Sequence, residues 1–138
     1  MDADRLKKLP LFEDLPHKEL ERIAMWADEV DVAEGKHLIE QGAFGHEFFV
    51  IEQGTAKVTH DGNVIAELTQ GDYFGELALL EQQRRQATVT ATTPLRVVVM
   101  FQREFEAMEH EMPEIAERIR ATVARRKQEI AEAEQEKS

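Results

Sequence analysis

The sequence predicts an α+β fold, mainly β, in which an antiparallel β-roll, or jelly roll, lies between N-terminal and C-terminal helices. Apolar residues recur at helical spacing before residue 29 and after residue 101, whereas short strand-like runs fill the stretch between them. All seven glycines of the chain fall inside that middle stretch, where a compact roll turns its corners. The 138 residues are enough for one such domain and too few for two.

The N-terminal segment, residues 1–28, is expected to be helical. Pro16 is of a type favoured at the first position of a helix. Behind it, apolar residues recur at helical spacing: Leu20, Ile23, Ala24 and Ala27. Trp26 is expected to pack this helix on the roll. The segment therefore predicts an amphipathic cover for one face of the sheet.

The roll is expected to span residues 29–101. Glycines separate its strand-like runs, which cover residues 30–32, 38–40, 48–52, 55–60, 64–68, 87–91 and 95–101. Asp61-Gly62 lies between two of these runs and predicts a tight hairpin, because both residues tolerate a positive φ. Residues 102–138 return to helical spacing, first over 103–108 and then beyond Pro113, and their polar end is expected to fray.

The composition excludes several classes of protein. With 28 acidic and 17 basic residues the formal net charge is -11, which repels nucleic acid and anionic membranes. No cysteine is present for disulfides, thiolate catalysis or cysteine-ligated zinc, and the five histidines lack metal-ligand spacing. Since no apolar stretch has the length of a membrane span or the pattern of a signal peptide, a cytoplasmic protein is expected.

One motif, within residues 73–89, predicts a site for a small cyclic phosphate. Gly75 precedes a short predicted helix, whose first N–H groups are unpaired and available to an anion. Nine positions after Glu76, Arg85 can return over the start of that helix and offer the two-pronged guanidinium that suits phosphate. Glu76 can only accept hydrogen bonds, and therefore suits a sugar hydroxyl.

The chain resembles the cyclic nucleotide-binding domains of the catabolite activator protein, of the regulatory subunits of cAMP-dependent protein kinase and of cyclic nucleotide-gated channels. Their phosphate-binding cassette resembles Phe74-Gly-Glu-Leu-Ala-Leu79 followed by Arg85-Gln-Ala-Thr-Val89, and the similarity extends over most of residues 10 to 110. The family implies a short helix inside the cassette and a non-catalytic regulatory module with no metal or cofactor. cAMP is the more common ligand, and cGMP stays open.

By position, the resemblance implies that Glu76 binds the ribose 2′-hydroxyl and Arg85 the cyclic phosphate. The other residues expected to bind the ligand are Phe74, Gly75, Leu77, Ala78, Gln86, Ala87 and Thr88. Two residues depart from the family pattern. Arg84 replaces the usual proline, which is expected to loosen the turn and to add a positive charge, and Gln86 leaves the base selectivity open.

The resemblance also implies a lid. In the family a helix after the roll closes over the base, and the corresponding candidates here are Ile119, Thr122, Val123 and Arg126. Packing of this helix on the roll or on a partner helix is an equally good interpretation of its apolar residues. Ligand binding would shift the lid between two states and so act on a protein partner or a fused effector domain, with a homodimer through the C-terminal helix also open.

Two other functions stay open at this point. A β-roll interaction module that has lost nucleotide binding would explain Arg84 and Gln86, although keeping both Glu76 and Arg85 would then be costly. A metal-dependent β-roll enzyme would need histidines and a carboxylate converging on one metal, which the spacing does not supply.

Overall fold

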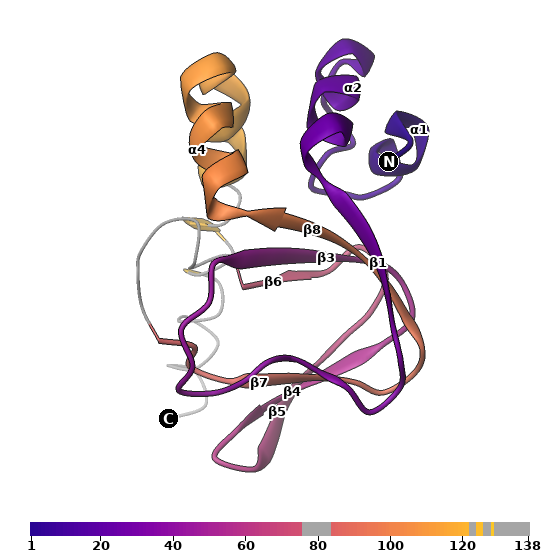
Figure 1. The fold of residues 1–138 in the computed structure, drawn as a ribbon, viewed down its shortest axis with the longest axis vertical. Helices are drawn as coiled ribbons and strands as arrows, with labels where there is room; N and C mark the ends of the chain where they lie inside the picture. Colours follow the sequence, from indigo (N-terminus) through magenta and orange to yellow (C-terminus); the bar gives the residue numbers. More distant parts are fainter. Residues whose placement is uncertain (76–83, 122–123, 126–127, 129–138) are drawn as a thin grey trace.

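The computed structural model describes residues 1–75, 84–121, 124, 125 and 128. Two four-stranded antiparallel sheets face each other, and the helices gather on the outer side of one of them (Figure 1). The predicted α+β fold with an antiparallel roll is confirmed. Its helices are α1 (Ala3–Lys7), α2 (His17–Trp26) and α4 (Gln102–Glu111), and its strands are β1 (Asp28–Val32), β2 (His37–Ile39), β3 (Glu47–Gln53), β4 (Ala56–His60), β5 (Asn63–Leu68), β6 (Tyr73–Phe74), β7 (Thr88–Ala91) and β8 (Leu95–Phe101).

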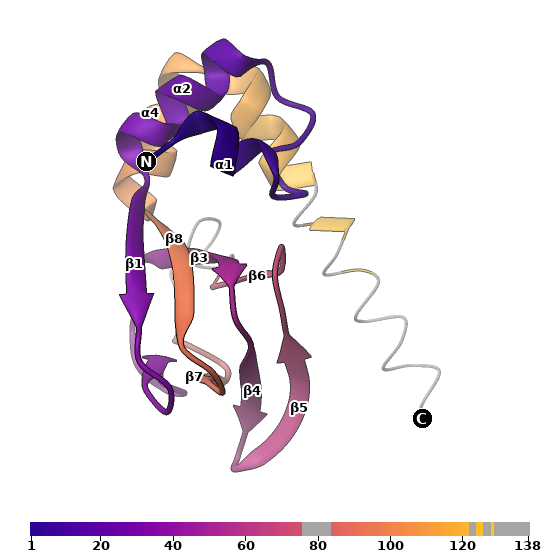
Figure 2. The same cartoon turned by 90° about the vertical axis from the view of Figure 1, so that its right-hand side faces the viewer.

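The two sheets have the strand orders β1-β8-β3-β6 and β2-β7-β4-β5. Strand β3 is buried along most of its length because both of its faces are covered. Phe49 and Ile51 point into the roll and pack against the second sheet, whereas Phe48 and Val50 pack against the helices. The sheet at the centre of the fold therefore separates a helical core from a roll core, as the side view in Figure 2 shows.

The hairpin between β4 and β5 turns at Asp61-Gly62, as predicted. Asp61 has φ 51° and Gly62 has φ 84°, and the flanking residues His60 and Asn63 pair directly across the turn. Two consecutive positive φ values are those of the two-residue turns whose twist matches that of the strands. The short sequence motif therefore places the turn of this hairpin, whereas its register shifts further along, between Val58 and Thr59.

The N-terminal segment forms two helices, α1 and α2, with turns between them. Residues 8–16 lie in turns that contain Pro10, whose ring removes a backbone N–H. Pro16 has extended geometry at the N-cap, with φ −60° and ψ 148°, and the helix begins at His17. Pro16 therefore precedes the first helical position instead of occupying it. Trp26 packs against the helical core as predicted.

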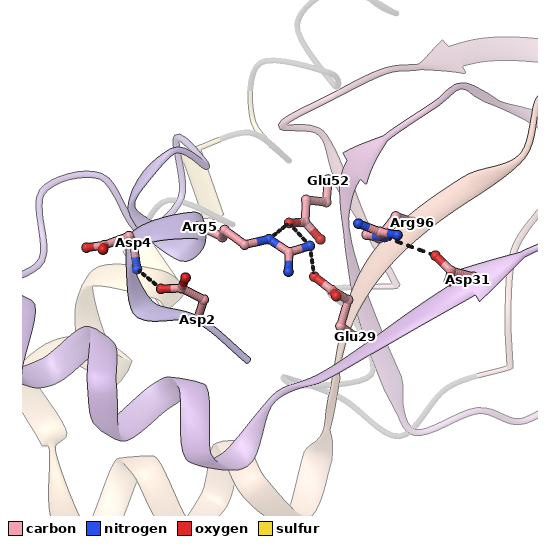
Figure 3. Close-up of polar contacts among 7 residues, drawn as sticks. All are labelled: Asp2, Asp4, Arg5, Glu29, Asp31, Glu52 and Arg96. Carbon is pink, nitrogen blue, oxygen red and sulfur yellow. Dashed lines mark hydrogen bonds and ion pairs between the residues drawn. The ribbon is translucent and has the colours of Figure 1, made fainter.

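Helix α1 is tied to the sheet by an ion-pair cluster (Figure 3). Its Arg5 reaches between Glu29 of β1 and Glu52 of β3, with both Nε and Nη2 at 2.7 Å from Glu52 Oε1 and Nη2 paired with Glu29. Asp2 caps the helix, since its carboxylate accepts the Asp4 N–H at 2.8 Å. This cluster joins a five-residue helix to two strands of one sheet.

After the roll, α4 ends at Met112, and helical backbone resumes over residues 113–121. Ile115 and Ile119 are both buried in the helical core, together with Phe12 and Leu20 of the N-terminal segment. None of the helices that the structure describes is long and apolar enough to cross a membrane.

Candidate functional site

Arg85 lies just before β7, where its backbone pairs with the loop between β2 and β3. The Arg85 N–H donates to the Ala43 carbonyl at 2.8 Å, and the Gly42 N–H donates to the Arg85 carbonyl at 2.8 Å. These two bonds pair Arg85 with the loop before β3. The side chain is only 8% exposed.

The Arg85 guanidinium is held by backbone carbonyls and by one carboxylate. Its Nη2 donates to the Glu47 carbonyl at 2.8 Å and to Glu47 Oε2 at 3.3 Å, and its Nη1 donates to the Gly75 carbonyl at 3.4 Å. A buried cation needs such partners, because removing it from water without them costs on the order of several kcal/mol. The motif thus brings Arg85 back over Gly75, as the sequence predicts.

Two glycines make the space for this guanidinium. A Cβ on Gly45 would lie 2.4 Å from Arg85 Nε and 2.8 Å from its Cζ. A Cβ on Gly75 would lie 2.7 Å from the Glu47 carbonyl oxygen and 3.0 Å from Arg85 Nη1, and Gly75 also has φ +79°. Gly75 is therefore required both by its positive φ and by the lack of room for a Cβ. Gly45 has no positive φ and is required only because there is no room for a Cβ beside Arg85.

The neighbouring Arg84 is held at the surface. Its Nη1 donates to the Gly42 carbonyl at 2.9 Å, and its guanidinium lies 4.4 Å from the centre of the exposed Phe44 ring. The Arg84 side chain therefore connects the cassette to the loop before β3, and the expectation that Arg84 loosens the turn relative to proline stays a prediction. Its positive charge stays on the outside, next to the buried one.

The remaining predicted ligand residues that the structure describes lie around Arg85. Phe74 is 5% exposed and stacks on Phe49 at 4.9 Å, so it forms part of the roll core. The Thr88 hydroxyl oxygen accepts the Gln41 N–H at 3.0 Å, and Ala87 beside it is half-buried. Gln86 is exposed and its carbonyl oxygen lies 2.7 Å from His60 Nδ1.

Several predicted site residues lie outside the residues that the structure describes. They are Glu76, Leu77 and Ala78 of the cassette, with its expected helix, and Thr122, Val123 and Arg126 of the lid. Ile119, the remaining lid candidate, is 2% exposed and lies in the helical core. Its contact with a ligand therefore stays a prediction, and the packing interpretation accounts for its position here.

Sequence reasoning did not identify Gly45 or Glu47 as site residues. Gly45 was one of seven glycines expected at corners, and nothing in its spacing links it to Arg85, which lies 40 positions later. Glu47 is the first residue of β3, where an acidic residue usually faces solvent. Within the described part of the chain, no group of three or more histidine and acidic residues is placed to hold a metal ion.

The model of the cyclic nucleotide-binding domain matches residues 29–111, which include β1 to β8 except the first residue of β1, the Arg85 site and all of α4. The chain belongs to the cyclic nucleotide-binding domain family. In this domain the buried arginine and the two glycines that surround it come from separate parts of the family match, the loop before β3 and the cassette.

The curated relatives that match this cyclic nucleotide-binding domain are longer than the chain. The cAMP-dependent protein kinase regulatory subunit of Yarrowia lipolytica is 41% identical over 105 residues, which cover 75% of this chain and 28% of that protein. The chain therefore spans less than a third of the length of that relative. The solved catabolite activator protein of Thermus thermophilus has a TM-score of 0.80 at 27% identity, covering 92% of this chain and 62% of that one. The cAMP-bound PfPKA-R has a TM-score of 0.72 at 28% identity, covering 88% and 46%.

Proposed function

We propose that this domain is a non-catalytic regulatory module that binds a cyclic nucleotide through Arg85, with cAMP as the preferred ligand. The observation that carries the proposal is a guanidinium only 8% exposed, in a cage of carbonyl oxygens beside Gly75. The carbonyl oxygens solvate this cation, and its one carboxylate partner, Glu47, makes a longer contact at 3.3 Å from a side chain that is 39% exposed. A cyclic phosphate carries one negative charge and two free oxygens, and so matches both the charge and the geometry of the guanidinium.

The choice of cAMP rests on the relatives. The curated proteins similar to this chain are named cAMP-dependent protein kinase regulatory subunits, and PfPKA-R was solved with cAMP. In the proposed complex Glu76 accepts the ribose hydroxyl, N–H groups after Gly75 approach the phosphate, and Ala87 and Thr88 line the base side. Gln86 is exposed, and its amide is available to a base that extends past the phosphate.

Transmission is proposed to run through the C-terminal helix to a protein partner or a fused effector domain. The relatives are regulatory rather than catalytic subunits, and no reaction is assigned to the domain. Ligand binding can shift this helix only by the difference in affinity between its two positions. The homodimer through this helix and the cytoplasmic location stay predictions.

Titration of the purified chain tests the proposal directly. We expect calorimetry to give a one-to-one complex with cAMP and weaker binding of cGMP, with 5′-AMP as the control that has the same base and sugar but an open phosphate. The interaction module that has lost its ligand predicts no heat with any of the three nucleotides. That result would overturn the proposal.

Replacing Gly45 by alanine tests the cage around the guanidinium. Because the new Cβ would lie 2.4 Å from Arg85 Nε, the guanidinium must move away from the position that two carbonyls define. We expect cAMP affinity to fall about fivefold, the equivalent of roughly one hydrogen bond. Gly35→Ala is the control for replacing a glycine away from Arg85: its Cβ would meet nothing within 4 Å, and its φ of +87° adds backbone strain at that turn. An equal loss of affinity in both variants would contradict the cage.

A further inference from the structure

The hydrogen bonds of Arg85 show that a carboxylate of the chain already occupies the part of the guanidinium that a phosphate needs. A guanidinium can bind two oxygens side by side along either of two edges, formed by Nε with Nη2 or by Nη1 with Nη2. Both edges include Nη2, which has two N–H groups. In this structure Nη2 donates to the Glu47 carbonyl at 2.8 Å and to Glu47 Oε2 at 3.3 Å. Neither edge is therefore open to a phosphate without displacing one of these oxygens.

The two oxygens differ in how easily they can leave. The Glu47 carbonyl belongs to the backbone of β3, which the register with β8 fixes from Glu47 onward. The Glu47 carboxylate is carried by a side chain that is 39% exposed, makes the longer contact, and can rotate into water. A ligand phosphate therefore displaces the carboxylate and leaves the carbonyl in place.

The carboxylate is also dispensable for orienting Arg85. The carbonyls of Glu47 and Gly75 hold Nη2 and Nη1 from two segments of the chain, and Gly45 fixes the position of the guanidinium by the space that it leaves. Removing the carboxylate would leave all three of these in place. It would also remove a negative charge that repels the phosphate across the same nitrogen.

We propose that Glu47 is an internal competitor of the ligand, whose carboxylate pairs with Arg85 in the free domain and lowers its affinity for cyclic nucleotide. This inference rests on the proposed function, because it presumes that Arg85 binds the ligand phosphate. The pairing keeps the buried guanidinium neutralised when no ligand is bound. It also makes binding an exchange of one anion for another.

Glu47→Gln tests the competition. The amide keeps the shape of the side chain and removes its charge, so we expect cAMP affinity to rise about twofold to fivefold, the range of a partly exposed ion pair. Glu34→Gln is the matched control, because it removes the same charge from an exposed turn. This turn lies away from Arg85, since the neighbouring Gly35 N–H donates to the carbonyl of Ala91, the last residue of β7. That control is expected to keep the affinity of the wild type.

A second readout separates competition from a purely structural role. The free Glu47→Gln protein is expected to melt at the same temperature as the wild type or slightly lower, while cAMP raises its melting temperature by more. Glu47→Asp, whose shorter side chain withdraws the carboxylate from Nη2, should show a smaller gain in affinity. Affinity that is unchanged or lower in Glu47→Gln, with binding by the wild type intact, would overturn this inference alone. Absence of cAMP binding by both proteins would overturn the proposed function together with it.

Discussion

Replacing Arg85 by alanine is expected to weaken cAMP binding at least tenfold while the fold stays intact. Charge-assisted hydrogen bonds are worth about 1.5 to 3 kcal/mol each, which corresponds to roughly tenfold to more than a hundredfold in Kd. The variant also empties the space that Gly45 and Gly75 leave for the guanidinium, while Arg84 stays in its contacts with Phe44 and Gly42 at the surface.

Two variants make this experiment specific. Arg103→Ala removes the same charge from a side chain of α4 that is 90% exposed, and is expected to leave cAMP affinity unchanged. Arg85→Lys keeps the positive charge but loses the planar guanidinium that donates two parallel hydrogen bonds. Its cAMP affinity should therefore lie between those of the wild type and Arg85→Ala. Calorimetry gives the affinities, and circular dichroism shows whether the roll is retained. Affinity unchanged in Arg85→Ala would reject Arg85 as the phosphate ligand.

The second large effect is expected at the other end of β3. Arg5→Met should lower the free energy of unfolding by about 2 to 3 kcal/mol at neutral pH. This is somewhat less than the usual cost of removing one partner of a buried ion pair, because the Arg5 side chain is 34% exposed. The reason is that Glu52, 9% exposed, and Glu29, 25% exposed, would then face each other without a cation. Oε2 of Glu52 is already buried without a hydrogen-bond partner among the described residues.

This loss of stability is expected to depend on pH. Burial raises the pKa of Glu52 above its ordinary value of 4.5, and the neighbouring Glu29 adds to the rise. Hydrogen bonding to the Glu52 carboxyl, together with the charges of Arg5 and Arg96, holds the pKa of Glu29 below that value. Glu52 therefore contributes stability that is full below pH 4.5 and is lost as the pH rises through its folded pKa. Glu29 contributes stability that is present above pH 4.5 and is lost as the pH falls through its folded pKa.

Arg5 lowers the pKa of both carboxyls, so its removal raises both. Protonated carboxyls do not repel each other, and the loss in Arg5→Met should be small near pH 4 and should grow as the pH rises above 4.5. Chemical denaturation at several pH values measures it. The double variant Arg5→Met/Glu52→Gln should regain most of the stability at neutral pH, because it removes the buried charge.

The exposed pair Arg22–Glu111 is the matched control for this experiment. It also joins an N-terminal helix to another element, at 3.0 Å, but its side chains are 41% and 51% exposed. Arg22→Met is therefore expected to cost less than about 1 kcal/mol and to show little dependence on pH. A cost for Arg5→Met that is equally small, or the same at pH 4 and pH 7, would contradict the account of the cluster.

Local patterns were sufficient for much of the fold. The Asp61-Gly62 turn, the strands of the roll and the return to helix after residue 101 follow from residue types and spacing within a few positions. Strand β6 was not predicted, because two residues carry no periodicity and Tyr73–Phe74 are extended only through pairing with β3. Helices were predicted for residues 1–28, but the turns over residues 8–16 were not, because apolar spacing alone does not mark where one helix ends and the next begins.

The sequence by itself determined the family motif, with Gly75 and Arg85 at a spacing that brings them together, and it determined the alternation that builds a two-sheet roll. The tertiary structure alone decided what surrounds the guanidinium. Gly45 and Glu47 lie 40 and 38 positions before Arg85, and they meet it because two backbone hydrogen bonds pair the loop before β3 with Arg85. Contacts between segments so far apart depend on sheet register, which no local pattern encodes, and the partner of a buried charge therefore becomes visible only in the folded chain.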